Sequence, residues 1–261
     1  MNRKERFLYD LMLASVSESG VRYPLAVVPA MKGAKVRGRP KLMVVGRAVN
    51  GWDDEGRFKA SELRDHDRRN AAVSRISTIA TGTSRGRGCP LVWIAQDWGS
   101  GTRVNYDPTR SPFWRVARLI GEGLGAFDLA TDSASWSSHL VWSNLAKAAP
   151  WGGGNPSNDL YNAQFPACKK LLLAEIQRFK PEHLLIVAGM TWACDFLDDS
   201  PFVGKQRSGQ SSVQWQGTIQ NGAATTKVVV TRRPEGKAEA PFVKAAIKAF
   251  SSLRPPQKET E

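Results

Sequence analysis

Residues Lys41 to Trp52 have the sequence KLMVVGRAVNGW, a short apolar run followed by a loop with two glycines. Positions 41–45 are predicted to form a strand buried in a parallel sheet, because the apolar residues at 42–45 leave no polar face. In the loop, the glycines bracket a cation, Arg47, and an amide, Asn50. Ligands bind beyond the carboxyl ends of the strands in open parallel sheets, where a glycine lets the backbone approach a ligand closely. The stretch therefore predicts a ligand-binding loop; the alternative is an ordinary turn that packs the closing tryptophan.

Further apolar runs predict more strands, with helices between them. Three of the buried strands, the first one included, end in polar or basic loops. Apolar residues at helical spacing predict the helices, one of which starts at Ser111-Pro112 with serine as the N-cap. This alternation predicts a single-domain three-layer α/β sandwich whose central four-stranded parallel sheet is flanked by helices. Buried strands are expected at residues 140–142, 183–188 and 227–231, a short strand at 91–94, and an exposed or edge strand at 213–219.

Three regions are predicted along the chain. Residues 1–40 combine an N-terminal helix with a basic extended arm, because the stretch 23–40 contains several prolines and glycines among its lysines and arginines. This arm either touches phosphates or is a solvated loop. Residues 41–253 form the α/β domain, and residues 254–261, RPPQKETE, form a disordered tail.

The charge of the chain indicates its partner. A formal net charge of +13 and a pI near 10.0 predict attraction to polyanions, of which nucleic acid is the commonest. The alternative is a basic surface that serves solubility alone. Because charge fixes neither sequence preference nor chemistry, the function has to be argued from the loops at the strand ends.

The sequence indicates neither a membrane protein nor a secreted one. Its apolar runs are too short to span a bilayer, and the N-terminus lacks the apolar segment and cleavage site of a signal peptide. We therefore expect a cytoplasmic monomer, associated with the nucleoid if the source is bacterial. The widely spaced Cys89, Cys168 and Cys194 match neither a disulfide framework nor a metal motif, so buried or inert thiols are expected.

Three predicted strand ends carry cationic and amide side chains without paired carboxylates. Of the histidines, His66 lies in a charged helical segment, and His139 and His183 lie at strand entrances, the wrong end for such a site. A metal centre, a Ser/His/Asp triad and a two-carboxylate hydrolase are therefore not expected. The absence of a Walker loop and of GxGxxG argues against a nucleotide cofactor. The side chains concerned are Arg47 and Asn50, then Asn144 and Lys147, then Arg232, Arg233 and Lys237.

The segment Val141–Pro156, VWSNLAKAAPWGGGNP, resembles the strand and loop of the uracil-DNA glycosylase superfamily, in which a strand ends in Asn, then Lys, then Pro and a GN-P turn. The spacing is closest to the branch that carries an iron–sulfur cluster. Residues Cys168–Gly189 are similar to the family's helix, Lys-Pro break and third strand. Arg233-Pro234 falls where the family places its His-Pro-Ser loop, and Lys41–Trp52 falls where it places its water-positioning motif.

The resemblance implies an enzyme that flips a base out of DNA and hydrolyses its N-glycosidic bond, acting on uracil or another damaged base. Asn50 would orient the water, and Arg233 would stand in the place of the catalytic histidine. The amide of Asn144 would read the Watson–Crick edge of the base, since an amide offers a donor beside an acceptor. The other base-binding residues would be Gly46, Arg47, Trp52 and Phe113, and the DNA-binding residues Lys147, Arg232, Pro234, Gly236 and Lys237.

The chain departs from the family at several positions. Arg233 replaces the histidine, the first motif contains no acidic side chain, and the cysteines do not match the cluster ligands, so we expect no cofactor and a lower or different activity. Individual residues have plainer alternatives: Asn144 as a loop cap, Phe113 as core, Arg233 as partner of a phosphate or carboxylate, and Lys147 as a solvated side chain. For the whole protein, the alternatives are an inactive nucleic-acid-binding member of the fold and a hydrolase or transferase acting on a nucleotide or free base.

Overall fold

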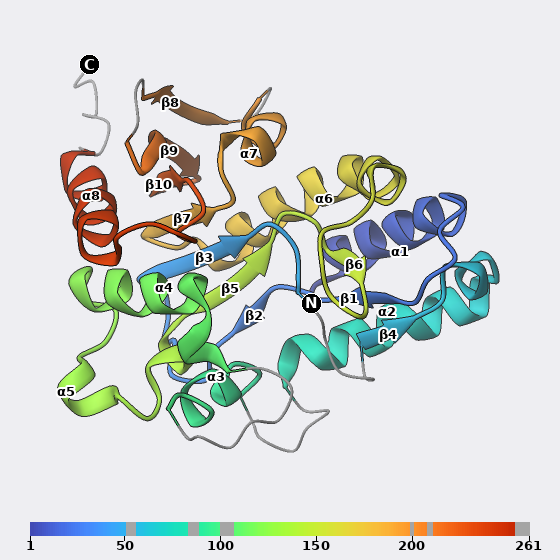
Figure 1. The fold of residues 1–261 in the computed structure, drawn as a ribbon. Coiled ribbons are helices and arrows are strands. Elements are labelled where there is room, and N and C mark those ends of the chain that lie inside the picture. The colour runs from blue at the N-terminus through green and yellow to red at the C-terminus, as the bar shows by residue number, and fades with distance from the viewer. Residues whose placement is uncertain (51–55, 83–88, 100–106, 199–200, 208–210, 254–261) are drawn as a thin grey trace.

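The computed structural model describes residues 1–50, 56–82, 89–99, 107–198, 201–207 and 211–253. Within them the chain forms an α/β fold around a mixed seven-stranded sheet with the order β2-β5-β3-β7-β10-β9-β8 (Figure 1). The predicted sheet is four-stranded and parallel; strands β5, β3, β7 and β10 are indeed parallel neighbours, but they form the centre of a larger, mixed sheet. The other three strands pair antiparallel at the two edges. The strands are β2 (Met31–Lys32), β3 (Leu42–Gly46), β5 (Val141–Asn144), β7 (His183–Val187), β8 (Phe202–Gln206), β9 (Val213–Asn221) and β10 (Ala224–Thr231).

Helices cover both faces of the sheet because successive residues of each central strand point to opposite sides. In β3, Met43 and Val45 join one core cluster, and Leu42 and Val44 join the other. The first cluster is completed mainly by α1 (Arg3–Ser17), α2 (His66–Thr81), α6 (Asn158–Phe179) and α7 (Met190–Leu197). The second is completed by α3 (Val92–Gln96), α4 (Pro112–Gly123) and α8 (Glu239–Ser252). Figure 1 shows α4 and α8 on one side of the sheet and α1 and α6 on the other.

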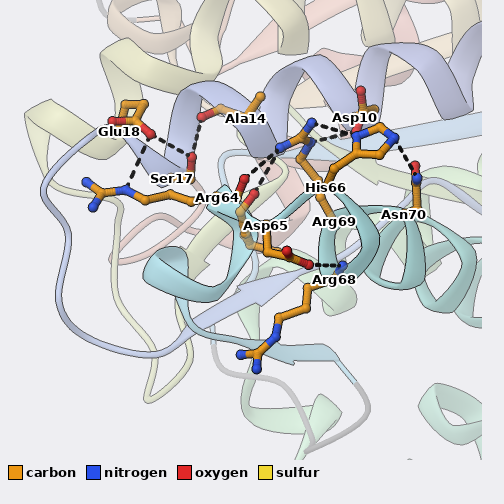
Figure 2. A network of polar contacts seen from close by, with 11 residues as sticks. Asp10, Ala14, Ser17, Glu18, Arg64, Asp65, His66, Arg68, Arg69 and Asn70 are labelled. Carbon is orange, nitrogen blue, oxygen red and sulfur yellow. Dashed lines mark hydrogen bonds and ion pairs between the residues drawn. The ribbon is translucent and has the colours of Figure 1, made fainter.

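The N-terminal helix α1 is an integral part of the first layer. A capping box between Asn2 and Glu5 starts it, and its buried face, which includes Leu13, packs against α6. On its outer side, Asp10 forms an ion pair of 2.7 Å with Arg69 of α2. Figure 2 shows this contact within a polar network that ties α1 to α2 and the turn before it.

The stretch 23–40, predicted as an extended basic arm, contributes two short strands. β2 pairs with β5, and β1 (Leu25–Val27) forms a small antiparallel sheet with β4 (Arg57–Phe58) and β6 (Ala148–Pro150). The side chains of β1 are fully buried, so this part is not a solvated loop. Lys35 is paired with Asp132, and Arg39 donates to backbone carbonyls of other segments. Short segments of this kind are held by tertiary pairing that the sequence pattern does not reveal.

Two strand predictions are corrected by the structure. Residues 91–94 lie at and within helix α3 instead of a strand, because a short apolar run fits a buried helix as well as a buried strand. Residues 213–219 belong to β9, which is paired on both sides by β10 and β8 and is therefore no edge strand. The predicted tail, 254–261, lies outside the described residues. The remaining described elements are α5 (Leu129–Asp132) and the 3₁₀ turns at Ala60–Arg64, Pro108–Arg110 and Trp136–His139.

None of the described helices combines the length and the apolar character needed to cross a lipid bilayer.

The packing of α1 predicts that the N-terminal region contributes to global stability. Leu13 is fully buried, whereas Leu11 on the same helix is 41% exposed. Leu13→Ala is expected to lower the free energy of unfolding by about 2–5 kcal/mol, and Leu11→Ala by less than about 0.5 kcal/mol. Urea denaturation followed by tryptophan fluorescence measures both. Equal midpoints for the two variants would show that residues 1–40 are a separate arm.

Candidate functional site

A pocket of about 260 Å³ lies at the carboxyl ends of the parallel strands. The loops after β3 and β10 line it together with the ends of β5 and β7, which is where ligands bind in open parallel sheets. The first turn of α4 and the loop before α6 complete its wall. Its lining consists of Gly46, Arg47, Ala48, Val49, Asn50, Ser111, Phe113, Trp114, Trp142, Asn144, Gly154, Asn155, Val187, Arg233, Pro234 and Glu235.

Asn144 presents its side-chain amide to this pocket. It is the last residue of β5, pairs in register with Gly46 of β3, and is only 3% exposed. Within the described residues, no hydrogen-bond partner of the amide is found, although its backbone carbonyl accepts a bond from Lys147. A nearly buried amide without a partner is costly unless a ligand or water completes it. The geometry therefore favours a ligand that offers both a donor and an acceptor.

Gly46 makes room for this amide. A Cβ on Gly46 would lie 2.6 Å from Asn144 Oδ1 and 3.4 Å from Cε2 of Phe113. The first distance is far shorter than van der Waals contact, so any larger residue would displace the amide. The glycine of the opening loop is therefore required by close approach of the next strand.

Phe113 provides an aromatic wall beside the amide. It lies in the first turn of α4, which Ser111 caps by accepting from the backbone N–H of Trp114, as predicted. Its ring meets that of Trp114 edge-on at 4.8 Å between centroids, and Trp114 meets Trp142 in the same manner at 5.4 Å. Phe113 is half-buried, so it both packs on the aromatic core and faces the pocket.

Arg47 is fixed at the pocket wall by neighbouring segments. Its Nε donates to the carbonyl of Ala188 at 2.7 Å, and its guanidinium lies 5.2 Å from the ring of Trp192. Gly189, with a φ of +80°, turns the chain between these two contacts. Burial lowers the pKa of Arg47, the charge of Arg233 lowers it further, and Glu235 acts in the opposite direction. A held cation of this kind can stabilise a nearby negative charge without reorganising.

Asn50 connects two loops at the pocket rim. Its Oδ1 accepts the backbone N–H of Gly154 at 2.9 Å, and the side chain is otherwise exposed. Asn50, Asn144 and Arg233, predicted from three separate strand ends, thus line a single pocket.

Arg233 forms an ion pair with Glu235, the carboxylate partner that was one of its expected alternatives. Its Nε lies 3.0 Å from each carboxylate oxygen, and its Nη2 also contacts Oε1. The side chains are 46% and 42% exposed, so the pair contributes no more than about 1 kcal/mol. Within the described residues, Glu235 is the only acidic side chain that lines the pocket. Glu235 is not among the residues predicted from the sequence, although it directly follows Arg233-Pro234.

Lys147 is not available to DNA, which contradicts its predicted role and also the alternative of a solvated side chain. It is fully buried, and its Nζ donates to Ser143 Oγ, to the Asn144 carbonyl and to Glu175 Oε2 at 2.7–2.8 Å. Ser143 Oγ also donates to Glu175 Oε2 at 2.8 Å. Every ammonium proton therefore has an acceptor, as a buried charge requires. The ion pair fixes the chain at Asn144 to helix α6.

The other predicted residues divide into three groups. Pro234 is buried and lines the pocket. Arg232, Gly236 and Lys237 lie in the same loop after β10 but do not line it; the latter two are exposed. Trp52 lies outside the described residues.

The described residues bring no three histidine, cysteine or acidic side chains together in a manner that would hold a metal ion. Cys89 and Cys168 are buried, and burial raises the pKa of the Cys168 thiol to about 12. That thiol is accordingly neutral and unreactive at physiological pH.

Comparison of the sequence with models of known protein families and with curated proteins finds no match.

The buried pair predicts an asymmetric response to mutation. Lys147→Met leaves the Glu175 carboxylate buried without its cation and should lower the free energy of unfolding by about 3–5 kcal/mol. The double variant Lys147→Met/Glu175→Leu should recover most of this loss, because apolar side chains of similar volume replace both charges. Urea denaturation of the two variants and the wild type provides the comparison. A single variant as stable as the wild type would contradict the buried pairing.

Proposed function

We propose that this protein is a DNA glycosylase with a uracil-DNA glycosylase-like fold, which hydrolyses the N-glycosidic bond of uracil or another damaged base. The observation that carries the proposal is the nearly buried amide of Asn144, which has no hydrogen-bond partner among the described residues and lies in a pocket beside the ring of Phe113. An amide side by side with an aromatic surface is suited to a planar base that offers a donor next to an acceptor. The resemblance of residues 141–156 and the parallel centre of the sheet support the same proposal.

Binding of DNA is supported by the charge of the chain. The net charge of +13 favours association with a phosphate backbone, and the two arginines at the pocket place part of that charge beside the base. The base reaches the pocket only after it is flipped out of the duplex, at a cost of a few kcal/mol in lost stacking and pairing. Phosphate contacts made by the loop after β10 offset this cost.

The chemistry assigns a role to each polar group. A departing base carries negative charge, and the held guanidinium of Arg47 lies at the pocket wall to stabilise it. Asn50, at the rim, orients the water that attacks the sugar. Asn144 determines which bases are accepted, and Phe113 stacks on the base that has entered.

A second function, binding of nucleic acid without catalysis, is favoured by one observation. Within the described residues, no histidine lines the pocket, and Asn50 is a neutral amide that cannot accept a proton from water. An inactive member of the fold would keep the same cleft and charge.

Oligonucleotides with a single uracil, hypoxanthine or xanthine distinguish the two functions. A glycosylase leaves an abasic site, which alkali converts into a strand break, at one of these bases. Asn144→Ala should lower the single-turnover rate by about 10²–10³-fold, since it removes the groups that hold the base. Asn70→Ala, on the outer surface of α2, is the matched control and should have no effect. Salt-sensitive binding without cleavage of any substrate would favour the inactive binder.

Gly46→Ala tests the close approach on which the pocket depends. The backbone of Gly46 is not in the left-handed region, so alanine fits the conformation, but its Cβ displaces the amide of Asn144. Excision should fall by at least about 10-fold while the melting temperature changes little. Gly152→Ala is the matched control, because a Cβ at Gly152 meets open space. Equal rates for these two alanine variants would show that the amide does not read the base.

A further inference from the structure

Glu235 introduces a carboxylate into a pocket whose other described lining residues are cationic, amide, hydroxyl and apolar. It lies in the turn after β10, where the N–H of Lys237 donates to the carbonyl of Pro234 at 3.0 Å. Gly236, with a φ of +68°, supplies the left-handed residue that such a turn needs at its third position. The turn therefore presents Glu235 to the pocket while Lys237 faces solvent.

The chemistry of base excision requires a group that the other pocket residues do not supply. Water that attacks the sugar must lose a proton, and an amide such as Asn50 orients water but does not take that proton. Oδ1 of Asn50 also accepts from the N–H of Gly154, which fixes the amide while leaving it a second lone pair and its NH2 group to orient the water. Arginine stays protonated and is no base. The carboxylate of Glu175 is held in the interior by Lys147 and does not line the pocket.

We propose that Glu235 is the carboxylate base of this site, and that Arg233 holds it in an ion pair until a DNA phosphate takes over the guanidinium. This inference rests on the proposed glycosylase function. In the reaction, the oxygen of water forms a bond to C1′ of the deoxyribose, and the bond from C1′ to the base nitrogen breaks. The electron pair of that bond leaves with the base, and the water proton passes to the Glu235 carboxylate.

The exchange of partners follows from the geometry of the pair. Both side chains are close to half exposed, so water already competes for the contact. A backbone phosphate offers Arg233 a charge-assisted, bidentate partner of the kind that the carboxylate now provides. Once Arg233 is bound to phosphate, Arg47 is the other cation near Glu235 and lies within the pocket itself. DNA binding thereby shifts the carboxylate from the rim toward the reacting centre.

This arrangement predicts opposite effects of Glu235→Gln on binding and on catalysis. Removing the negative charge frees Arg233, so the Kd for DNA should fall by about 3–10-fold, whereas the single-turnover rate should fall by about 10²–10⁴-fold. Glu235→Asp, which keeps the carboxylate, should retain more activity than Glu235→Gln. A purely structural role would weaken binding and turnover together.

Glu239→Gln is the matched control because Glu239 is also paired with an arginine, Arg115, at 2.7 Å and at a comparable exposure. It changes the net charge equally but lies outside the pocket lining, so its turnover should equal that of the wild type. Fluorescence anisotropy on undamaged duplex DNA measures Kd, and a quenched-flow assay on the best substrate measures the rate.

Two results would overturn the inference while the glycosylase function stands. Turnover of Glu235→Gln equal to that of Glu239→Gln would show that Glu235 takes no proton, and a faster turnover would show that it only blocks the site. Wild-type protein that cleaves no damaged oligonucleotide would instead overturn the glycosylase function, and this inference with it, before any variant is compared.

Discussion

The buried ion pair between Lys147 and Glu175 is the interaction on which the shape of the pocket depends. Bringing two charges out of water costs several kcal/mol per ion, and their attraction offsets this only when the remaining protons are bonded. Here the ammonium reaches Ser143 and the carbonyl of Asn144 on β5, and the carboxylate comes from α6. An apolar pair would fill the same volume but would hold no carbonyl. What the pair provides is therefore position: it fixes the strand end from which the amide of Asn144 enters the pocket.

The central sheet could be predicted from the sequence because its strands are buried on both faces. Runs such as Leu42–Val45 have no polar side, and only a parallel sheet covered by helices accommodates several of them. The sheet margins could not be predicted in the same way. The stretch that contains β1 and β2 and the run that begins α3 are too short for periodicity to distinguish helix, strand and loop. Their structure is set by partners far away in the chain, which a local pattern does not contain.

The pocket could be predicted in outline for a different reason. Parallel strands end at the same edge of a sheet, so Asn50, Asn144 and Arg233 had to lie near one another once the four strands were assigned. The site predictions that the structure corrects concern the burial and the ion pairing of individual side chains. A lysine after a strand end is usually a surface cation. Nothing near Lys147 in the sequence shows that it forms a buried ion pair with Glu175, which lies in helix α6. The carboxylate of Glu235 was not predicted, because a single acidic side chain two positions after Arg233 carries no motif of its own.

The composition of the pocket constrains how any chemistry there is controlled. In enzymes that use histidine, one residue both carries positive charge and exchanges a proton near neutral pH. Arginine keeps its proton and asparagine is neutral, so neither exchanges a proton near neutral pH. Among the described lining residues, Arg47 and Arg233 therefore carry the positive charge, and Glu235 is the group proposed to transfer the proton. Because Arg233 and Glu235 form one ion pair, the cation that meets a phosphate and the carboxylate that meets water are not independent. In the proposed mechanism, a substitution that strengthens the pair would weaken both DNA binding and access of the carboxylate to the reacting water, and one that breaks it would separate the two effects.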